Sequence, residues 1–599
     1  MEKNTLLAVV LSVVVITLGF MIQNTFFPAP QQSTPAPVVQ ETKGEIQDQN
    51  AGKTSGQVSE QAPATSTQAA QPAAAASADA SSGFVPWDGE NQPPLSTAPV
   101  MENNHFIVTF STRGGTVSSI KLKEHIDKGQ PLEMVQKGKS DINAFELYFG
   151  DNNVKPLQDL MYYSKPDENT IVFYRNFKIR GDESGAFFTL KKTYVFKPND
   201  YLFELRVALE NSVNQYLPFN YNGYSYTLGY GPQIGPYAEK LNGRYEYRKY
   251  YTYSNGKRIN NKLKTNDEKS VANSVFWSAI VGKYFTVIAV PDSTNYRVTF
   301  SNKQVEGVNI TSQMFLSRPL IKSSKNEDVY RFYVGPKLKS ALASYDKADK
   351  NGFGVQDLNL EEVIDTSSIL GWLEWILLQI LHLSYKVIPN YGIAIIILTI
   401  IIKTVLFPFT HKSFESTSRM QALTPKINEL KEKYKDNPTK MNTEMQALYK
   451  KENVNPMGGC LPMLLQMPIF FALYGLLNKY FQLRGAVFIP GWITDLSSPE
   501  SILSLPFTIP IVGWSDIRLL PILFTLTMIL SNKMMKNPST EMSASGGDSM
   551  KMMTTLMPVM FFFIMYNSPS GLLLYWTLTN VITAGQQKYI SNKLIRKKS

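Results

Sequence analysis

The feature that most constrains this sequence is a series of apolar segments in its C-terminal half. Five segments are candidate membrane spans: Tyr391–Phe409, Met457–Leu477, roughly Leu519–Met535, Met552–Tyr566 and Leu572–Ala584. A helix needs about 20 apolar residues to cross a bilayer. The last three are shorter, so they require shielding by neighbouring helices or a locally thinner bilayer. With a further apolar segment near the N-terminus, the pattern predicts a polytopic α-helical membrane protein with six spans.

The first 99 residues divide into an apolar segment and a low-complexity region. Residues 1–28 contain the apolar stretch Thr5–Ile22, and no A-x-A-like cleavage site follows it, which favours an uncleaved membrane anchor over a signal peptide. Residues 29–99 are dominated by Ala, Pro, Gln, Ser and Thr. Such a composition buries too little apolar surface to offset the entropy of the chain. We therefore predict a disordered linker over 29–99.

Residues 100–350 show the alternation of apolar and polar side chains that is typical of β-strands. Stretches such as "TIVFYRNFKI" and "FFTLKKTYVF" are rich in aromatic and β-branched residues and are separated by Gly, Asn, Asp or Pro. This pattern predicts an all-β sandwich domain. Neither G-x-S-x-G nor H-E-x-x-H occurs. A scaffold or docking role is favoured, and an anchored carbohydrate enzyme stays open as an alternative.

Residues 361–390 predict an amphipathic helix that lies along the membrane surface. Apolar residues repeat at helical spacing on one stripe: Leu370, Leu373, Ile376, Leu377, Ile380 and Leu381. Trp372 and Trp375 suit the headgroup region, and Glu374 argues against an ordinary span.

Residues 411–456 predict a helical hairpin, and residues 588–599 a basic tail. Two apolar stripes in the hairpin are spaced by three and four residues and fit facing helices: Met420, Leu423, Ile427, Leu430 and Tyr434, then Met441, Met445 and Leu448. Its basic side chains are candidates for docking a ribosome or another partner: Lys412, Arg419, Lys426, Lys431, Lys433, Lys450 and Lys451. The tail could contact anionic lipids or ribosomal RNA.

The distribution of positive charge predicts the orientation in the membrane. Nine Lys and Arg residues occur in 411–456, three in 532–551 and five from residue 588 onwards, whereas 482–516 contains only Arg484. Basic loops stay on the cytoplasmic side. We therefore expect both termini in the cytoplasm and the β-domain outside, as in a bacterial inner membrane protein.

Lys403 is an unusual residue because it interrupts the apolar segment "IIILTIIIKTVLFPF". A charge near the middle of a span costs about 2.5–3.5 kcal/mol unless it faces water or a partner. The five candidate spans contain no Asp or Glu. A water-filled cavity, extended by Thr399 one turn away, is the favoured environment, and partial snorkelling of the side chain is the alternative. Ten of the 22 methionines lie between Met528 and Met565, where flexible thioethers could adapt to varied apolar partners.

Three segments resemble the YidC-type membrane protein insertases: "NVNPMGGCLPMLLQMPIFFALYGLL", the hairpin with "MQALYKKE", and "PSGLLLYWTLTNVITAGQQ". The resemblance implies a five-helix insertase core over 391–599, with a hydrophilic groove open to the cytoplasm. It implies that Lys403, Thr399, Gln466, Tyr575 and Trp576 line this groove and that Phe470 contacts client proteins. The family has arginine where this chain has Lys403, so the charge is kept but the planar fork that grips a carboxylate is lost.

The same resemblance implies a protein that is not an enzyme. Its expected partners are nascent membrane-protein clients, the Sec translocon, the ribosome, signal-recognition machinery and anionic lipids, with no small-molecule substrate. We expect no cofactor and no metal, and the single cysteine, Cys460, excludes a Cys-rich metal site. A transporter or channel with Lys403 in the substrate path is the alternative.

Overall fold

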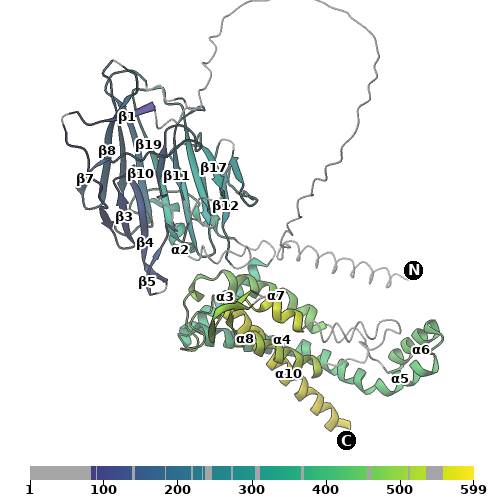
Figure 1. Cartoon of the computed structure of the whole chain (residues 1–599). Coiled ribbons are helices and arrows are strands. Elements are labelled where there is room, and N and C mark those ends of the chain that lie inside the picture. The colour runs from purple at the N-terminus through teal and green to yellow at the C-terminus, as the bar shows by residue number, and fades with distance from the viewer. Residues whose placement is uncertain are drawn as a thin grey trace, which may run out of the picture.

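The computed structural model shows a β-domain set on a helical region (Figure 1). It describes residues 83–598, apart from 90, 128, 138–141, 183, 217–219, 221, 232–233, 236–245, 272–273, 304–310, 366–369, 453, 455–460, 510–512 and 535–557. The predicted anchor, 1–28, and most of the predicted linker lie outside the described residues.

The β-domain is built around a ten-stranded antiparallel sheet. Its strands, in spatial order, are β1 (Phe84–Trp87), β8 (Thr170–Ile179), β9 (Phe188–Val195), β10 (Leu202–Asn211), β19 (Lys325–Pro336), β16 (Phe285–Pro291), β15 (Trp277–Val281), β12 (Lys249–Ser254) and β13 (Lys257–Asn260), with β7 (Tyr162–Asp167) also paired to β8. Long registers such as Leu202↔Tyr333 to Glu210↔Lys325 hold its centre together.

Two smaller sheets complete the domain. One contains β14 (Glu268–Val271), β17 (Arg297–Ser301), β18 (Gln313–Pro319), β11 (Tyr224–Tyr230) and β6 (Glu146–Tyr148); the other contains β2 (Val100–Glu102), β3 (Phe106–Ser111), β4 (Thr116–Asp127) and β5 (Gln130–Glu133). Buried and half-buried residues alternate along β3, and β16 is buried throughout. One hydrophobic core joins all the sheets, with rings such as Phe110, Tyr194 and Trp277 inside it. This arrangement confirms the predicted β-sandwich.

Both ends of the β-domain differ from the predicted boundaries. Strand β1 pairs with β8 in register Phe84↔Ile179, so the linker prediction is wrong for the end of 29–99. The apolar residues of "FVPW" that follow the low-complexity stretch allow this pairing, and Phe84 is buried in the domain core. At the other end, the short helix η5 (Leu360–Val363) buries Leu360 and Val363 in the same core. The start of the predicted interfacial segment, 361–390, therefore belongs to the β-domain.

The helical region contains seven α-helices with stated bounds among the described residues. They are α3 (Gly371–Val387), α4 (Tyr391–Ala422), α5 (Thr424–Lys433), α6 (Pro438–Lys451), α7 (Leu461–Lys479), α8 (Leu519–Met534) and α10 (Ser570–Lys598). Residues 558–565 are also helical. Helix α10 packs against α8 and α4, and α3 packs against α4 and α7. Leu377 and Leu381 of α3 are buried in this helical core, while Trp372 and Trp375 are exposed. Ile376, which the sequence pattern placed on the same apolar stripe, is 39% exposed, so the predicted stripe is buried only in part.

Two helices continue further than the sequence pattern predicts. Helix α4 runs through Pro408 into the predicted hairpin, and α10 continues to Lys598 through the predicted basic tail. The tail lacks proline and contains good helix formers such as Leu, Lys and Arg, which explains its helical state. The two hairpin stripes pack together around Ile427, Met441 and Met445. Among the described residues, one helix, Tyr391–Met420, is long and apolar enough to cross a membrane by itself, and Leu519–Lys533 is shorter.

The β-domain contacts the helical region through the segment after α7. The ring of Phe481, in the short helix η7 (Phe481–Leu483), lies 5.3 Å from His125, 5.8 Å from Tyr284 and 5.5 Å from Phe285 between centroids. Lys283 Nζ donates a hydrogen bond to the backbone oxygen of Ser497 at 3.2 Å. These contacts place the β-domain against one end of the helical core.

Candidate client-binding site

The candidate site lies where α4, α7 and α10 meet, around the ammonium group of Lys403. Lys403 is only 5% exposed, although it is the one charged residue in the apolar part of its helix, 391–409. Its Nζ donates to Gln466 Oε1 on α7 at 3.1 Å and to Thr583 Oγ1 on α10 at 2.8 Å. Three helices that are far apart in the sequence therefore share one charged group.

Within the part of the chain that the structure describes, Lys403 has no carboxylate within ion-pair distance. Its two acceptors are neutral side chains, so the positive charge is solvated by dipoles and is not balanced by an anion. A charge in an apolar region is expensive to bury without a counter-ion. The site is therefore suited to attract a carboxylate brought by another molecule.

Helix α10 supplies a polar stripe that the sequence analysis identified only in part. Tyr575, Thr579, Thr583 and Gln587 are spaced by four residues, which places them on one helical face. Tyr575, Thr579 and Gln587 are buried, and Thr583 is half-buried. The spacing from Tyr575 was the signal that could have found Thr579 and Thr583. Thr399, by contrast, is fully buried and donates its hydroxyl to Ile395 O of its own helix at 2.7 Å.

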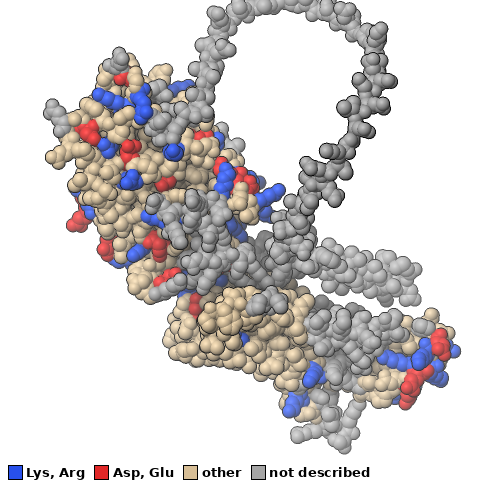
Figure 2. All heavy atoms as spheres, viewed as in Figure 1, with Lys and Arg blue, Asp and Glu red and all other residues tan. Residues whose placement is uncertain are grey.

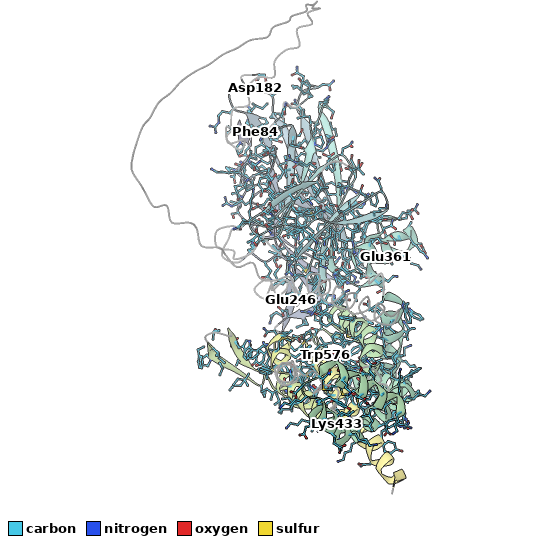
Figure 3. All side chains as sticks on the ribbon, turned by 90° about the vertical axis from the view of Figure 1, so that its right-hand side faces the viewer. Phe84, Asp182, Glu246, Glu361, Lys433 and Trp576 are labelled. Carbon is cyan, nitrogen blue, oxygen red and sulfur yellow. The ribbon has the colours of Figure 1, made fainter. Side chains whose placement is uncertain are left out.

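Aromatic rings form an apolar wall beside the polar stripe. Trp576 stacks on Phe470 with centroids 4.8 Å apart and an interplanar angle of 5°, and it also stacks on Phe524 at 5.5 Å. Figure 3 shows Trp576 within the helical region. The structure thus brings together Lys403, Gln466, Phe470, Tyr575 and Trp576 from the sequence predictions and adds Thr583 and Phe524.

The basic residues predicted for docking lie on the exposed sides of α4, α5 and α6. Lys412, Arg419, Lys426, Lys433, Lys450 and Lys451 are exposed, and Lys431 is half-buried. Two of them form ion pairs: Arg419 with Glu415 at 2.7 Å and Lys426 with Glu452 at 2.7 Å. Figure 2 shows basic and acidic side chains gathered at this end of the molecule, whereas the middle of the helical region shows few charges on the same face.

The described residues contain no group of three or more His, Cys, Asp or Glu side chains arranged to hold a metal ion. The chemistry of the site is therefore that of one cation, several hydroxyl and amide groups and an aromatic wall. Such a set offers one positive charge, hydrogen-bonding groups and apolar rings to a bound molecule.

Fold, composition and site together define an inner-membrane protein with a helical membrane region and a periplasmic β-sandwich domain. The family model described as "60Kd inner membrane protein" matches residues 383–598, and the model of the YidC periplasmic domain matches residues 100–383. The chain belongs to the YidC family of membrane protein insertases. The proteins of this family are insertases and not enzymes.

Individual relatives match over almost the whole chain. A membrane protein insertase YidC from Treponema denticola is 38% identical over 100% of this chain and 100% of its own length. The corresponding protein from Treponema pallidum is 34% identical over 98% of each chain. A solved structure titled as an active YidC insertase with its first transmembrane domain resolved covers 82% of this chain and 94% of its own, with 18% identity and a TM-score of 0.33.

Proposed function

We propose that this protein inserts client membrane proteins through a hydrophilic groove built around Lys403. The observation that supports the proposal most strongly is the ammonium group of Lys403, which has two neutral acceptors, Gln466 and Thr583, on two other helices. A client segment that carries Asp or Glu would supply the missing counter-charge. The groove would then act as an intermediate position for a polar segment that must cross the apolar layer.

The energetics of insertion favour a role in which the protein lowers a barrier and does not supply energy. Apolar residues gain about 0.3–0.6 kcal/mol each on insertion scales, so the client span itself favours the membrane. The barrier is the polar segment that has to cross, and a buried positive charge with neutral acceptors lowers that barrier by offering a favourable electrostatic environment partway. The membrane potential adds about 2.3 kcal/mol per charge per 100 mV. The aromatic wall of Phe470, Trp576 and Phe524 would contact the apolar part of the client.

The orientation and the partners belong to the same proposal. The apolar segments favour six spans. The basic loops on one side of the membrane favour a cytoplasmic location for both termini and a periplasmic location for the β-domain. The exposed basic hairpin favours docking of a ribosome or signal-recognition machinery, and the basic end of α10 favours anionic lipids. Work beside the Sec translocon follows only from the family resemblance. The family matches favour this function over a transporter with Lys403 in its substrate path.

Charge reversal at Lys403 tests the proposal. Full-length protein in proteoliposomes is given a single-span client with an acidic tail, and tail translocation is measured by protease protection. Lys403→Glu should abolish insertion because a buried anion repels the tail, while Lys403→Arg should retain it. The matched control is Lys386→Glu, which reverses an exposed charge at the end of α3.

An unchanged insertion yield with Lys403→Glu would remove the charge from the mechanism. A second client with a neutral tail separates a folding defect from an electrostatic one. Lys403→Glu should leave that client's insertion much less affected.

A further inference from the structure

A short β-hairpin between α7 and α8 projects from the helical region and exposes an apolar face. Its strands are β20 (Leu503–Ile509) and β21 (Trp514–Ile517), which pair antiparallel with Leu503 opposite Ile517 and Ser504 opposite Asp516. Figure 3 shows two strands extending sideways from the helices. An isolated two-stranded hairpin is marginally stable in water, so its surroundings must contribute.

One face of this hairpin is attached to the helical region. The ring of Trp514 stacks on Tyr566 with centroids 3.5 Å apart and an interplanar angle of 8°, and it also contacts Phe563. Tyr566 Oη donates to the backbone oxygen of Asp516 at 2.6 Å. The Asp516 carboxylate accepts from Ser504 at 2.8 Å and lies 3.6 Å from Arg518. Because side chains alternate along a strand, Trp514 and Asp516 lie on the same face.

The opposite face exposes large apolar side chains beside the small polar Ser515. Ile517 and its cross-strand partner Leu503 share this face, and they are 37% and 56% exposed. Phe507 lies in the stretch between Ser504 and Ile509 where the pairing register shifts, and its side chain is 61% exposed. Large apolar side chains that are exposed close together mark a contact surface.

The apolar face continues into the apolar surface of the adjoining helices. Helix α8 begins two residues after β21 and exposes Leu526 and Leu530, and the helix at 558–565 exposes Phe563. In a membrane protein these helical side chains face lipid. The stacked Trp514 and Tyr566, with Arg518 beside them, match the aromatic and charged residues found at the boundary between hydrocarbon and water.

We infer that the β20–β21 hairpin lies in the interfacial layer of the outer leaflet, with Leu503, Phe507 and Ile517 in contact with lipid. Within the described residues, β20 and β21 pair only with each other, so the outer edges of the hairpin need water or headgroups and the hairpin stays at the interface, outside the hydrocarbon centre. Its attachment through Trp514 to the helix at 558–565 would hold the outer ends of α8 and that helix at a fixed depth.

Depth-dependent fluorescence quenching tests this inference in the full-length protein. The native cysteine is replaced by Cys460→Ser, and Phe507→Cys is labelled with a fluorophore in vesicles of phosphatidylethanolamine and phosphatidylglycerol. Leu526→Cys on α8 is the lipid-facing reference. Asp182→Cys, at the far end of the β-domain in Figure 3, is the aqueous reference.

We expect lipids with a nitroxide near the headgroup to quench the Phe507→Cys label several-fold more than the Asp182→Cys label. Lipids with a nitroxide deep in the chain should quench it less than they quench Leu526→Cys. Quenching equal to that of Asp182→Cys would overturn the inference. Protection from both lipid nitroxides and aqueous iodide would also overturn it, because a protein surface would then cover the hairpin. Ser504→Cys, on the attached face, should be quenched less than Phe507→Cys.

Discussion

Lys192 in the β-domain and Lys403 in the helical core are both buried, and they differ in the groups that hold them. Lys192 of β9 is fully buried and donates to the backbone oxygens of Gly114 at 3.0 Å and Phe145 at 2.7 Å. Lys403 of α4 donates to the side chains of Gln466 and Thr583. Backbone oxygens of a folded sheet domain cannot move away, whereas side chains on separate helices can rotate.

The two lysines also differ in the charged groups around them. Burial lowers the pKa of Lys192 to about 7, and the charge of Glu146 opposes that shift. Burial also raises the pKa of Glu146, which accepts hydrogen bonds from the backbone of Asn143 and from Tyr148. Lys192 therefore belongs to a closed set of partners that fixes the fold. Lys403 has no such acid among the described residues, and its partners can exchange for those of a client.

The largest expected effect of this difference is on stability. Lys192→Met should lower the free energy of unfolding by about 3–5 kcal/mol, because it leaves two buried carbonyls without their donor and removes the positive charge near the buried Glu146. Lys403→Met should be close to neutral, since an apolar side chain suits an apolar surrounding. Urea denaturation of the full-length protein in detergent, followed by pulse proteolysis, measures both.

Lys191→Met provides the matched control for that measurement, because Lys191 is the exposed neighbour on the same strand. The loss of unfolding free energy caused by Lys191→Met should be much smaller than the loss caused by Lys192→Met. Equal losses for Lys192→Met and Lys403→Met would show that both lysines are structural, and the contrast between the two regions would fail.

The sequence alone was enough to predict the two-part architecture. The period-two alternation in stretches such as Thr170–Ile179 specified strands, because one face of each must meet a core. The apolar stripes around Ile427 and Met445 specified the hairpin. Strand β1 was missed because it has only four residues. When composition is averaged over a longer window, these four apolar residues are hidden by the low-complexity stretch before them.

The site was predictable one residue at a time but not as a set of contacts. Lys403 stands out because a charged side chain is expensive to place in an apolar segment. The family resemblance indicated Gln466, Phe470 and Trp576. Thr583 is 180 residues away from Lys403 along the chain, and no local pattern indicates that their side chains meet. Only the packing of α10 against α4 shows this contact.

A second prediction uses the titration of Lys192. Its pKa in the folded protein, about 7, is lower than the ordinary value of 10.5. Between these two pH values the unfolded chain binds more protons, so the stability of the wild-type protein should rise with pH, by up to about 1.4 kcal/mol per pH unit. Lys192→Met removes this contribution. The difference in unfolding free energy between the wild type and Lys192→Met should therefore grow from pH 7 to pH 9.

Lys191→Met again serves as the comparison for the pH series, and its difference from the wild type should stay constant. A pH-independent difference for Lys192→Met would mean that this lysine keeps its proton throughout the range. The closed network around Glu146 would then stabilise the charge more strongly than burial opposes it.

The smallest expected effect tests whether the partners of Lys403 are exchangeable. Thr583→Val keeps the branched shape of the side chain and removes one of the two acceptors of the ammonium group. If a client carboxylate replaces Thr583, loss of this hydrogen bond should favour the client by about 1 kcal/mol, or about fivefold in capture. Crosslinking of an acidic-tailed client to a probe at Phe470 measures capture.

Thr525→Val on α8 is the control for this substitution, because the Thr525 hydroxyl donates only within its own helix, to Pro521 O at 2.8 Å. It should leave capture unchanged. A fall in capture with Thr583→Val would mean that Thr583 holds Lys403 in the orientation that a client needs. The helical core would then resemble the β-domain, with a buried lysine whose partners are fixed.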